Sequence, residues 1–399
     1  MKYSLNLGGK IIELEVSRLA EQANGAVSAR CGDTLVLTTC AMSAEDKEGL
    51  GFFPLTVEYQ ERYYAAGKIK GARYIRREGK PSDEAICNSR LIDRAIRPLF
   101  PPQLKREVQV ISTVLAWDGE NDPDILSLIS ASAALHISNI PWNGPLGAVR
   151  VSGKEEGFAL NGTSKEREQS QLDMIFAGPG AGLVNMIEGG FNEVSEDLVL
   201  KAYDMSVAQI NKIIEAQEEM REKFGKEKIQ LIPEERDEEA SSAMEKFLGQ
   251  KLESAFFQKD KQKRAEELAS LKKELLEYVM NELGEDKLAY AGKFWDEQQD
   301  RLVHENILKS GKRADGRKLD EIREISCEVG LIPRAHGSAL FCRGQTKALS
   351  ILTLGSPGDQ QLVESMEMAG KKRFMHHYNF PPYSVGEVGP LRGPGRREI

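Results

Sequence analysis

The chain lacks any long apolar run. Its 399 residues hold no stretch approaching the roughly 18 apolar residues that a membrane-spanning helix needs. The N-terminus, MKYSLNLGGKIIELEVSRLAEQANG, has no uninterrupted apolar segment behind Lys2, which argues against a secretory signal. With 40% hydrophobic and 29% charged residues, the composition predicts a cytoplasmic globular protein with no membrane partner, long enough for two or three domains.

Cysteine is scarce and irregularly spaced. The five cysteines form no C-x-x-C pair, and their odd number argues against a disulfide framework and against a zinc site. We therefore expect buried, unpaired thiols. The residues concerned are Cys31, Cys40, Cys87, Cys327 and Cys342.

Positive charge is also scarce over most of the chain. The net charge of −8 argues against nonspecific nucleic-acid binding by the whole surface. Residues 61–106, however, carry twelve Lys or Arg against five Asp or Glu, a local charge of +7, which leaves −15 for the rest. A basic region is therefore confined to about one ninth of the sequence.

An internal repeat divides the chain. GAVSARCGDTLVLTT at 25–39 aligns with GSALFCRGQTKALSI at 337–351 at an offset of 312. YAAGKI at 64–69 matches YSVGEV at 383–388 at an offset of 319, and Arg76-Arg77-Glu78 returns as Arg396-Arg397-Glu398 at an offset of 320. Three matches in the same order indicate two copies of one domain. A charge-dense stretch with helical spacing separates them.

The repeat predicts an α+β chain in three parts. These are a first domain at 1–230, an all-helical domain at 231–310 and the incomplete start of a second copy at 311–399. In the first copy, SDEAICNSRLIDRAIRPLF predicts a helix capped by Ser82 that ends before Pro98. A second, longer helix is expected from Ser195 to Gly225.

The second copy holds only opening strands. We expect the apolar faces of these strands to lack packing partners, because the elements that would cover them are missing. Protease is then expected to remove the residues after Lys312 first.

The basic region contains the loop ARYIRREGKP. Glycines and Pro81 flank it as turn residues, so Tyr74, Arg76 and Arg77 are expected on a protruding tip between a strand and a helix. Paired guanidinium groups beside an aromatic ring suit single-stranded polynucleotide, because the guanidinium groups take phosphates and the ring stacks a base. An exposed loop with incidental arginines is the alternative.

Three arginines follow on the predicted helix. Spacings of four and three put Arg90, Arg94 and Arg97 on one face, opposite the apolar side. A single arginine here would pair with Asp93 as a structural ion pair. Three exceed that one nearby carboxylate, which favours an external anion such as phosphate or a nucleic-acid backbone.

The chain resembles the N-terminal part of the bacterial polynucleotide phosphorylases. The resemblance rests on FFPLTVEYQERYYAAGKIKG, RREGKPSD, SRLIDRAIRPLFP, RADGRKLDEIREI, RAHGSALFCRGQTKAL and GPGRREI. It implies two ribonuclease PH-like domains, the second truncated, joined by a helical domain and followed by KH-type and OB-fold modules. It further implies a ring-shaped homotrimer that degrades single-stranded RNA from 3′ to 5′. Inorganic phosphate and Mg²⁺ take part, nucleoside diphosphates are released, and the reaction can run in reverse as polymerisation. A larger RNA-degradation complex is a possible partner.

The resemblance also assigns roles to residues. Arg76 and Arg77 match a channel loop that grips RNA, although Tyr74-Ile75 stands where two phenylalanines are usual. The helix with Arg90, Arg94 and Arg97 matches a basic helix near the RNA path. Arg396 and Arg397 match arginines that serve RNA and phosphate at the active site.

Catalytic residues are expected elsewhere. The family's catalytic carboxylates, lysine and phosphate-binding serines, with the ligands of Mg²⁺, are expected beyond Ile399. In the first copy, KEREQSQLDMIFAG keeps only Asp173 of the catalytic pattern. Arg167 stands at the place of an aspartate and Ile175 at that of the lysine. We therefore expect an RNA-guiding first copy and a chain without turnover. A non-catalytic RNA-binding ring subunit or scaffold is the alternative.

Overall fold

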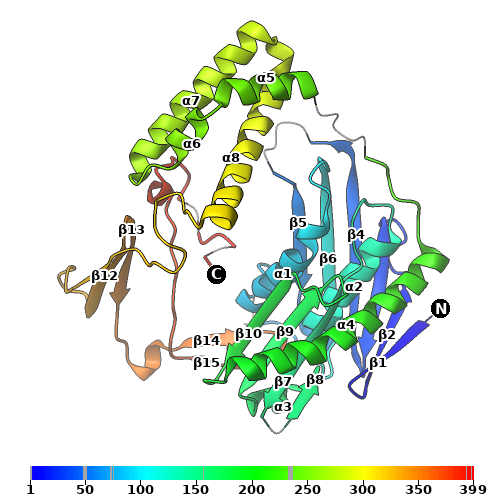
Figure 1. Cartoon of the computed structure of the whole chain (residues 1–399). Coiled ribbons are helices and arrows are strands. Elements are labelled where there is room, and N and C mark those ends of the chain that lie inside the picture. The colour runs from blue at the N-terminus through cyan, green and yellow to red at the C-terminus, as the bar shows by residue number, and fades with distance from the viewer. Residues whose placement is uncertain are drawn as a thin grey trace. The chain divides into compact units, whose positions relative to one another are not determined.

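The computed structural model describes residues 2–47, 52–71, 74, 76–155, 157–231, 237–391, 393–396 and 398–399. It divides into two compact units. One comprises Met1–Pro233 together with Pro357–Ile399, and the other comprises Glu234–Ser356. Figure 1 labels their elements, which mix helices and sheets as the α+β prediction requires.

A six-stranded sheet forms one layer of the first unit. Its order is β1-β2-β3-β4-β6-β5, with β5 and β6 parallel and every other pair antiparallel. The parallel pair requires a crossover, which the 3-10 turn η1 (Tyr63–Ala66) and helix α1 (Asp83–Ile96) provide. The strands are β1 (Lys2–Leu7), β2 (Lys10–Val16), β3 (Gly25–Cys31), β4 (Thr34–Asp46), β5 (Leu55–Gln60) and β6 (Arg106–Ala116).

A second sheet and a long helix complete this unit. The sheet order is β10-β9-β7-β8, from β7 (Gly147–Lys154), β8 (Gly157–Leu160), β9 (Leu172–Gly178) and β10 (Met186–Phe191). Helix α4 (Glu196–Phe224) packs its apolar side on this sheet, while a short helix, α3 (Ser164–Glu168), precedes β9. No strand was predicted for β10, whose two glycines weaken its strand signal.

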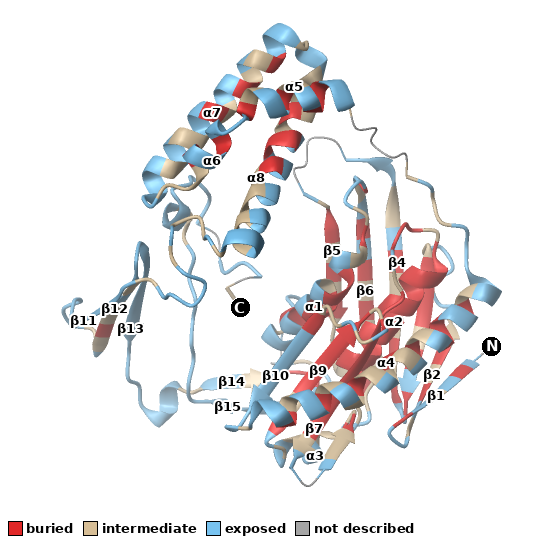
Figure 2. Cartoon of the chain, viewed as in Figure 1, coloured by how far each residue is buried: buried red, intermediate tan, exposed pale blue. Residues whose placement is uncertain are grey.

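Helix α2 (Pro123–Ile137) lies at the centre of the first unit. Every one of its residues is buried, as the red ribbon of Figure 2 shows. It packs against β3 and β4 and also contacts β7 and α4. Its serines are satisfied within this core: Ser130 bonds to Thr38 at 2.6 Å and Ser132 to Gln217 at 2.6 Å.

The predicted helix ends are largely correct. Ser82 caps α1 by accepting a hydrogen bond from the Ala85 amide at 2.9 Å, and α1 ends at Ile96, before Pro98. Ser195 and Gly225 flank α4, but the Ser195 side chain makes no capping hydrogen bond. The apolar side of α1 is buried at Leu91, Ile92 and Ile96.

The repeat is visible in local structure. The hairpin β3–β4 turns at Gly32, and the hairpin of β12 (Gly337–Arg343) and β13 (Thr346–Leu352) turns at Gly344. Both glycines have φ of 59°, the left-handed conformation that this turn requires. Likewise η1 ends at Gly67 and η5 (Pro382–Val385) ends at Gly386, each in the left-handed region. The two copies therefore share their opening turns.

The second unit is helical over most of its length. Leu271, Leu275 and Val279, at helical spacing on α7, are buried with Phe294 and Trp295 in a separate core. The helices are α5 (Glu238–Leu248), α6 (Lys251–Phe256), α7 (Lys261–Glu282) and α8 (Leu288–Ser310), followed by β11 (Ile325–Val329), β12 and β13. Across the described residues, no helix combines the length and apolar character needed to cross a membrane.

The second copy is packed unevenly. β11 and β13 are exposed throughout, as expected of strands whose faces lack packing partners. β14 (Gln361–Glu364) and β15 (Ala369–Lys372) are also largely exposed, but the tip of their hairpin is not, because Met366 is 0% exposed within the core of the first unit. The Tyr63 hydroxyl donates to the Glu364 carbonyl at 2.6 Å and the Lys68 ammonium donates to the Met366 carbonyl at 2.8 Å.

The prediction of buried thiols is only partly correct. Cys31 and Cys40 are buried, whereas Cys87 and Cys327 are exposed and Cys342 is half-buried; all five are free. Cys87 lies on α1, and Cys327 lies on the exposed β11. Neither position has the packing that the prediction assumed.

Candidate nucleic-acid interface

The loop between η1 and α1 presents the predicted tip residues to solvent. Tyr74 is 89% exposed, and Arg76 and Arg77 are exposed as well, whereas Ile75 lies outside the described residues. One nitrogen of Arg76, Nη1, donates to the carbonyls of Lys70 at 3.2 Å and Gly71 at 2.8 Å. Because a guanidinium has five N–H donors in a rigid fork, these bonds orient Arg76 and still leave donors for a phosphate.

The arginine face of α1 is more neutralised than the sequence suggests. Arg97 pairs with Asp93 at 2.8 Å and donates to the carbonyls of Phe53 and Leu55. Arg94 pairs with Glu188. The premise of one nearby carboxylate was therefore wrong, because β10 brings a second one from far along the chain.

Arg90 differs from the other two arginines. Its Nη1 donates to main-chain oxygens of Arg396 and Ile399, both at 3.4 Å. Neither partner is a side-chain carboxylate, so Arg90 is the one of the three without such a partner in the described part of the chain. The structure thus brings together Arg90 of α1 and the backbone of Arg396 in the second Arg-Arg-Glu triplet.

The second triplet is held against the first copy. Arg396 Nη1 donates to the Val57 carbonyl at 3.0 Å, and its Nη2 pairs with Glu58 on β5. The guanidinium is therefore engaged by an edge strand of the six-stranded sheet. Arg397 lies outside the described residues.

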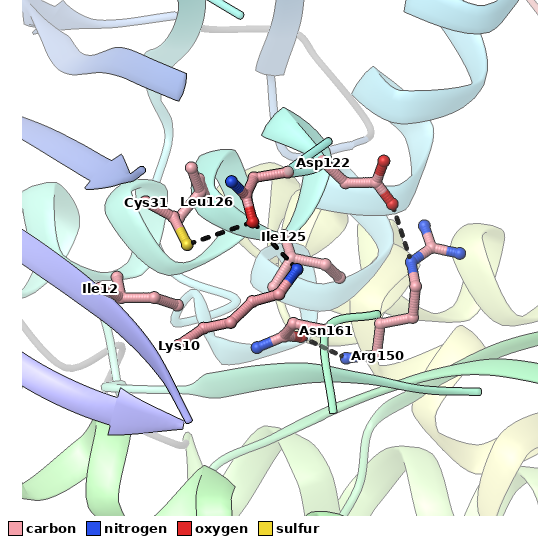
Figure 3. A pocket seen from close by; sticks show the side chains of 9 residues that line it. Lys10, Ile12, Cys31, Asp122, Ile125, Leu126, Arg150 and Asn161 are labelled. Atoms are coloured by element: carbon pink, nitrogen blue, oxygen red, sulfur yellow. Dashed lines mark hydrogen bonds and ion pairs between the residues drawn. The ribbon is translucent and has the colours of Figure 1, made fainter. Parts of the chain in front are cut away.

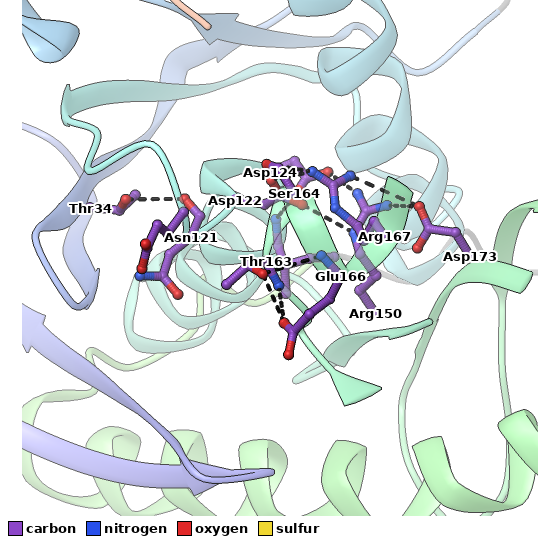
Figure 4. A network of polar contacts seen from close by, with 12 residues as sticks. Thr34, Asn121, Asp122, Asp124, Arg150, Thr163, Ser164, Glu166, Arg167 and Asp173 are labelled. Carbon is purple, nitrogen blue, oxygen red and sulfur yellow. Dashed lines mark hydrogen bonds and ion pairs between the residues drawn. The ribbon is translucent and has the colours of Figure 1, made fainter. Parts of the chain in front are cut away.

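A network of charges that the sequence reading missed lies beside the start of α2. Figure 4 shows Arg150 of β7 and Arg167 of α3 pointing toward three carboxylates. Arg150 pairs with Asp122 at 3.3 Å and Asp173 at 2.8 Å, and also with Asp124. Arg167 pairs with Asp122 at 2.7 Å and lies 3.9 Å from Asp173. Three carboxylates therefore share two guanidinium groups.

Burial sets the protonation in this network. It raises the pKa of Asp122 to about 7, and the neighbouring charge of Asp124 adds to the rise, while Arg150 and Arg167 oppose it. Burial disfavours the charge of Arg150, but the three carboxylates outweigh it, so the pKa of Arg150 lies above its usual value. The spacing Asp122-x-Asp124 is the signal that the sequence offers for this network.

This network does not fit a divalent metal. The carboxylates are already neutralised by guanidinium groups, and within the described ranges no three His, Cys, Asp or Glu side chains are grouped to hold an ion. Ile175, at the place of the resemblance's lysine, is 5% exposed in the core. We therefore assign no step of chemistry to Mg²⁺ at this position.

A small cavity adjoins the network. Figure 3 shows Lys10, Cys31 and Asn161 around it. Asn121 also lines the cavity, and its Oδ1 accepts a hydrogen bond from Lys10 Nζ at 2.9 Å. Its volume is about 20 Å³, room for about one water molecule. A nucleotide cannot enter it, so the exposed arginines remain the candidate interface.

The fold and the site together define a class. It is a duplicated α+β protein that presents arginines on the loop between a 3-10 turn and a helix. A model of the 3′ exoribonuclease family, domain 1, matches residues 9–141 and 321–399, which fall on the two copies of the repeat. A model of the polyribonucleotide nucleotidyltransferase RNA binding domain matches residues 239–318. The chain belongs to the 3′ exoribonuclease family.

Curated relatives agree with the resemblance predicted from sequence. The polyribonucleotide nucleotidyltransferase of Thermomicrobium roseum is 46% identical over 405 residues, covering 99% of this chain and 51% of the relative. Those of Caldicellulosiruptor saccharolyticus and Thermodesulfovibrio yellowstonii are 45% and 46% identical, covering 100% of this chain and 56% and 57% of the relatives. The chain spans about half the length of the curated relatives it matches.

Proposed function

We propose that this chain is the RNA-guiding part of a 3′-to-5′ phosphorolytic exoribonuclease. In that reaction inorganic phosphate attacks the terminal linkage of single-stranded RNA and a nucleoside diphosphate leaves; the reverse reaction polymerises. The exposed loop carries the proposal, because Tyr74 stands there beside Arg76 and Arg77. Membership of the 3′ exoribonuclease family supports it.

Each candidate residue has a role in this proposal. Arg76 and Arg77 take RNA phosphates while Tyr74 stacks on a base. Arg90 offers a cation that no side-chain carboxylate of the described residues neutralises, whereas Arg94 and Arg97 would exchange Glu188 and Asp93 for phosphate. Arg396 and Arg397 would contact RNA or phosphate once Arg396 leaves Glu58.

The proposal extends to the whole protein. It places the chain in a cytoplasmic homotrimer, with Mg²⁺ as cofactor at the active site of the second copy and an RNA-degradation complex as a partner. The domains proposed are 1–230, 231–310 and 311–399. The names of the curated relatives and the RNA binding domain matched at 239–318 support the enzyme class.

RNA binding tests the proposal directly. Arg76→Glu combined with Arg77→Glu should weaken the affinity for oligo(A) and oligo(U) alike, because phosphate contacts carry no base information. Lys154→Glu with Lys201→Glu is the matched control, since it makes the same charge change at exposed positions of the same unit. Equal losses of RNA affinity in the two double variants would refute a specific role for the loop in RNA binding.

The second candidate is a non-catalytic RNA-binding scaffold. It is favoured by Arg150 and Arg167, which already occupy the carboxylates of the first copy. Incubation of the 399-residue chain with RNA, phosphate and Mg²⁺ should release no nucleoside diphosphate, provided that the expression host lacks its own such enzyme. A full-length protein that is equally inactive would favour the scaffold over the exoribonuclease.

A further inference from the structure

The repeated triplet ends in a glutamate whose side chain makes specific contacts. In the first copy, Glu78 Oε1 accepts a hydrogen bond from the Tyr63 amide at 2.9 Å. Its other oxygen, Oε2, pairs with Arg62 Nη1 at 3.1 Å, and the Glu78 side chain is 22% exposed. Tyr63 is the first residue of η1, so Glu78 joins the end of the arginine loop to the turn that precedes it.

The second copy shows a similar contact at a different residue, because Pro382, which aligns with Tyr63, has no amide hydrogen. Glu398 Oε1 accepts from the Phe380 amide at 2.7 Å, and Oε2 accepts from the Gly395 amide at 2.6 Å. Phe380 lies two residues before η5, the counterpart of η1. In both copies the glutamate that follows two arginines binds a main-chain amide at the entrance of the 3-10 turn.

Further bonds fix the same loop in the first copy. Ser82 donates to Glu61 at 2.9 Å, which ties the start of α1 to the residue two positions before η1. Arg62 Nη2 donates a hydrogen bond to Gln60 Oε1 at 2.6 Å. Glu78 is therefore linked through Arg62 to Gln60, the last residue of β5. Arg76 and Arg77 therefore directly precede an anchored residue on a loop whose two ends are held together.

We propose that Glu78 is a positioning residue that clasps the arginine loop to η1 and thereby holds Arg76 and Arg77 in the place where they meet RNA; Glu398 does the same for the second triplet. The proposal rests on the proposed function of the loop. An anchored loop has less freedom to lose when RNA binds, so the clasp raises affinity without contacting RNA. The hydrogen bond from the Tyr63 amide to the Glu78 carboxylate is charge-assisted, and such bonds are stronger than those between neutral groups.

The competing interpretation is a simple ion pair between Glu78 and Arg62. Such partly exposed pairs contribute little to stability. Under that interpretation, removal of Glu78 only deletes a negative charge, and RNA affinity rises slightly. The clasp predicts the opposite sign, a loss of affinity.

The experiment compares three substitutions with a control. Glu78→Ala should weaken RNA binding roughly tenfold, the equivalent of losing one hydrogen bond to a charged group. Glu78→Gln keeps an oxygen for the Tyr63 amide and should retain most of the affinity. Glu78→Asp keeps the charge but withdraws it by one methylene, so it should weaken binding even if Glu78→Ala fails to fold. Glu45→Ala, an exposed carboxylate of the same unit, controls for lost charge.

Two further readouts separate the possible failures. Hydrogen exchange at the Tyr63 amide should accelerate in Glu78→Ala and Glu78→Asp but not in Glu78→Gln, whether or not RNA is present. In a background of Arg76→Ala with Arg77→Ala, Glu78→Ala should cause no further loss of affinity, because it acts through those arginines. Faster exchange with unchanged affinity would overturn the positioning role while the proposed function stands. Unchanged affinity on loss of the arginines themselves would overturn both.

Discussion

Replacing Arg150 by methionine tests the charge network of the first copy. The substitution keeps an unbranched side chain, although a shorter one, and leaves Asp122, Asp124 and Asp173 with Arg167 as their remaining cation. Breaking a buried ion pair from one side costs about 3–5 kcal/mol, because the partner charges stay buried. We expect a loss of this size in the free energy of unfolding at pH 8.

The loss should depend on pH. The folded pKa of Asp122, about 7, exceeds its unfolded value of about 4, so this group favours the folded state most at low pH and loses that contribution as pH rises through 7. Arg150 lowers the pKa of Asp122, whereas the negative charges of Asp124 and Asp173 raise it, so loss of Arg150 should raise the pKa of Asp122 further. At pH 5 Asp122 is protonated, so Arg150→Met should cost clearly less there than at pH 8.

Urea denaturation at pH 5 and pH 8 measures both effects. Trp295→Phe in every variant removes the tryptophan signal of the helical core, so that Trp117 and Trp142, both at the core of the first unit, report its unfolding. Arg30→Met is the control, since its pair with Asp33 is exposed and should contribute about 0–1 kcal/mol. Equal losses at the two pH values, or a loss no larger than the control's, would refute the account of the network.

The other predictions concern the frame around the arginine loop. Ser82→Ala should lower the free energy of unfolding by about 1 kcal/mol through loss of the cap on α1; no fall in thermal midpoint would contradict this. Limited proteolysis should cut first in the exposed strands β11 and β13 and leave residues 357–399 associated with the first unit. Met366→Glu places a charge in that unit's core and should release this segment sooner; an unchanged digest would argue against the docked hairpin.

Local sequence patterns predicted much of the fold. The spacing of apolar residues and Ser82 were sufficient for α1, and the repeat of residues 25–39 at 337–351 agrees with the matching hairpins at Gly32 and Gly344. These features depend on neighbours within a few residues, so the sequence records them directly. The exposure of Tyr74 and the two arginines of the tip followed from the flanking glycines in the same way.

Contacts between distant segments could not be predicted. Glu188 neutralises Arg94 only because β10 pairs with β9 beside α1, and β10 itself gave no strand signal. Asp173 meets Arg150 because β9 pairs with β7, and Asp122 meets it because α2 packs against β7. The docking of Met366 likewise depends on a hydrophobic site that no local pattern specifies.

The salt dependence of RNA binding tests the central claim most directly. Titrations of single-stranded RNA at several salt concentrations give the log–log slope for the parent chain and for Arg76→Glu with Arg77→Glu. Each lost phosphate contact flattens the slope by roughly 0.7, so loss of two contacts should flatten it by about 1.4. A flatter slope with weaker binding is the result that the account predicts, and the same slope and affinity in both proteins would contradict it.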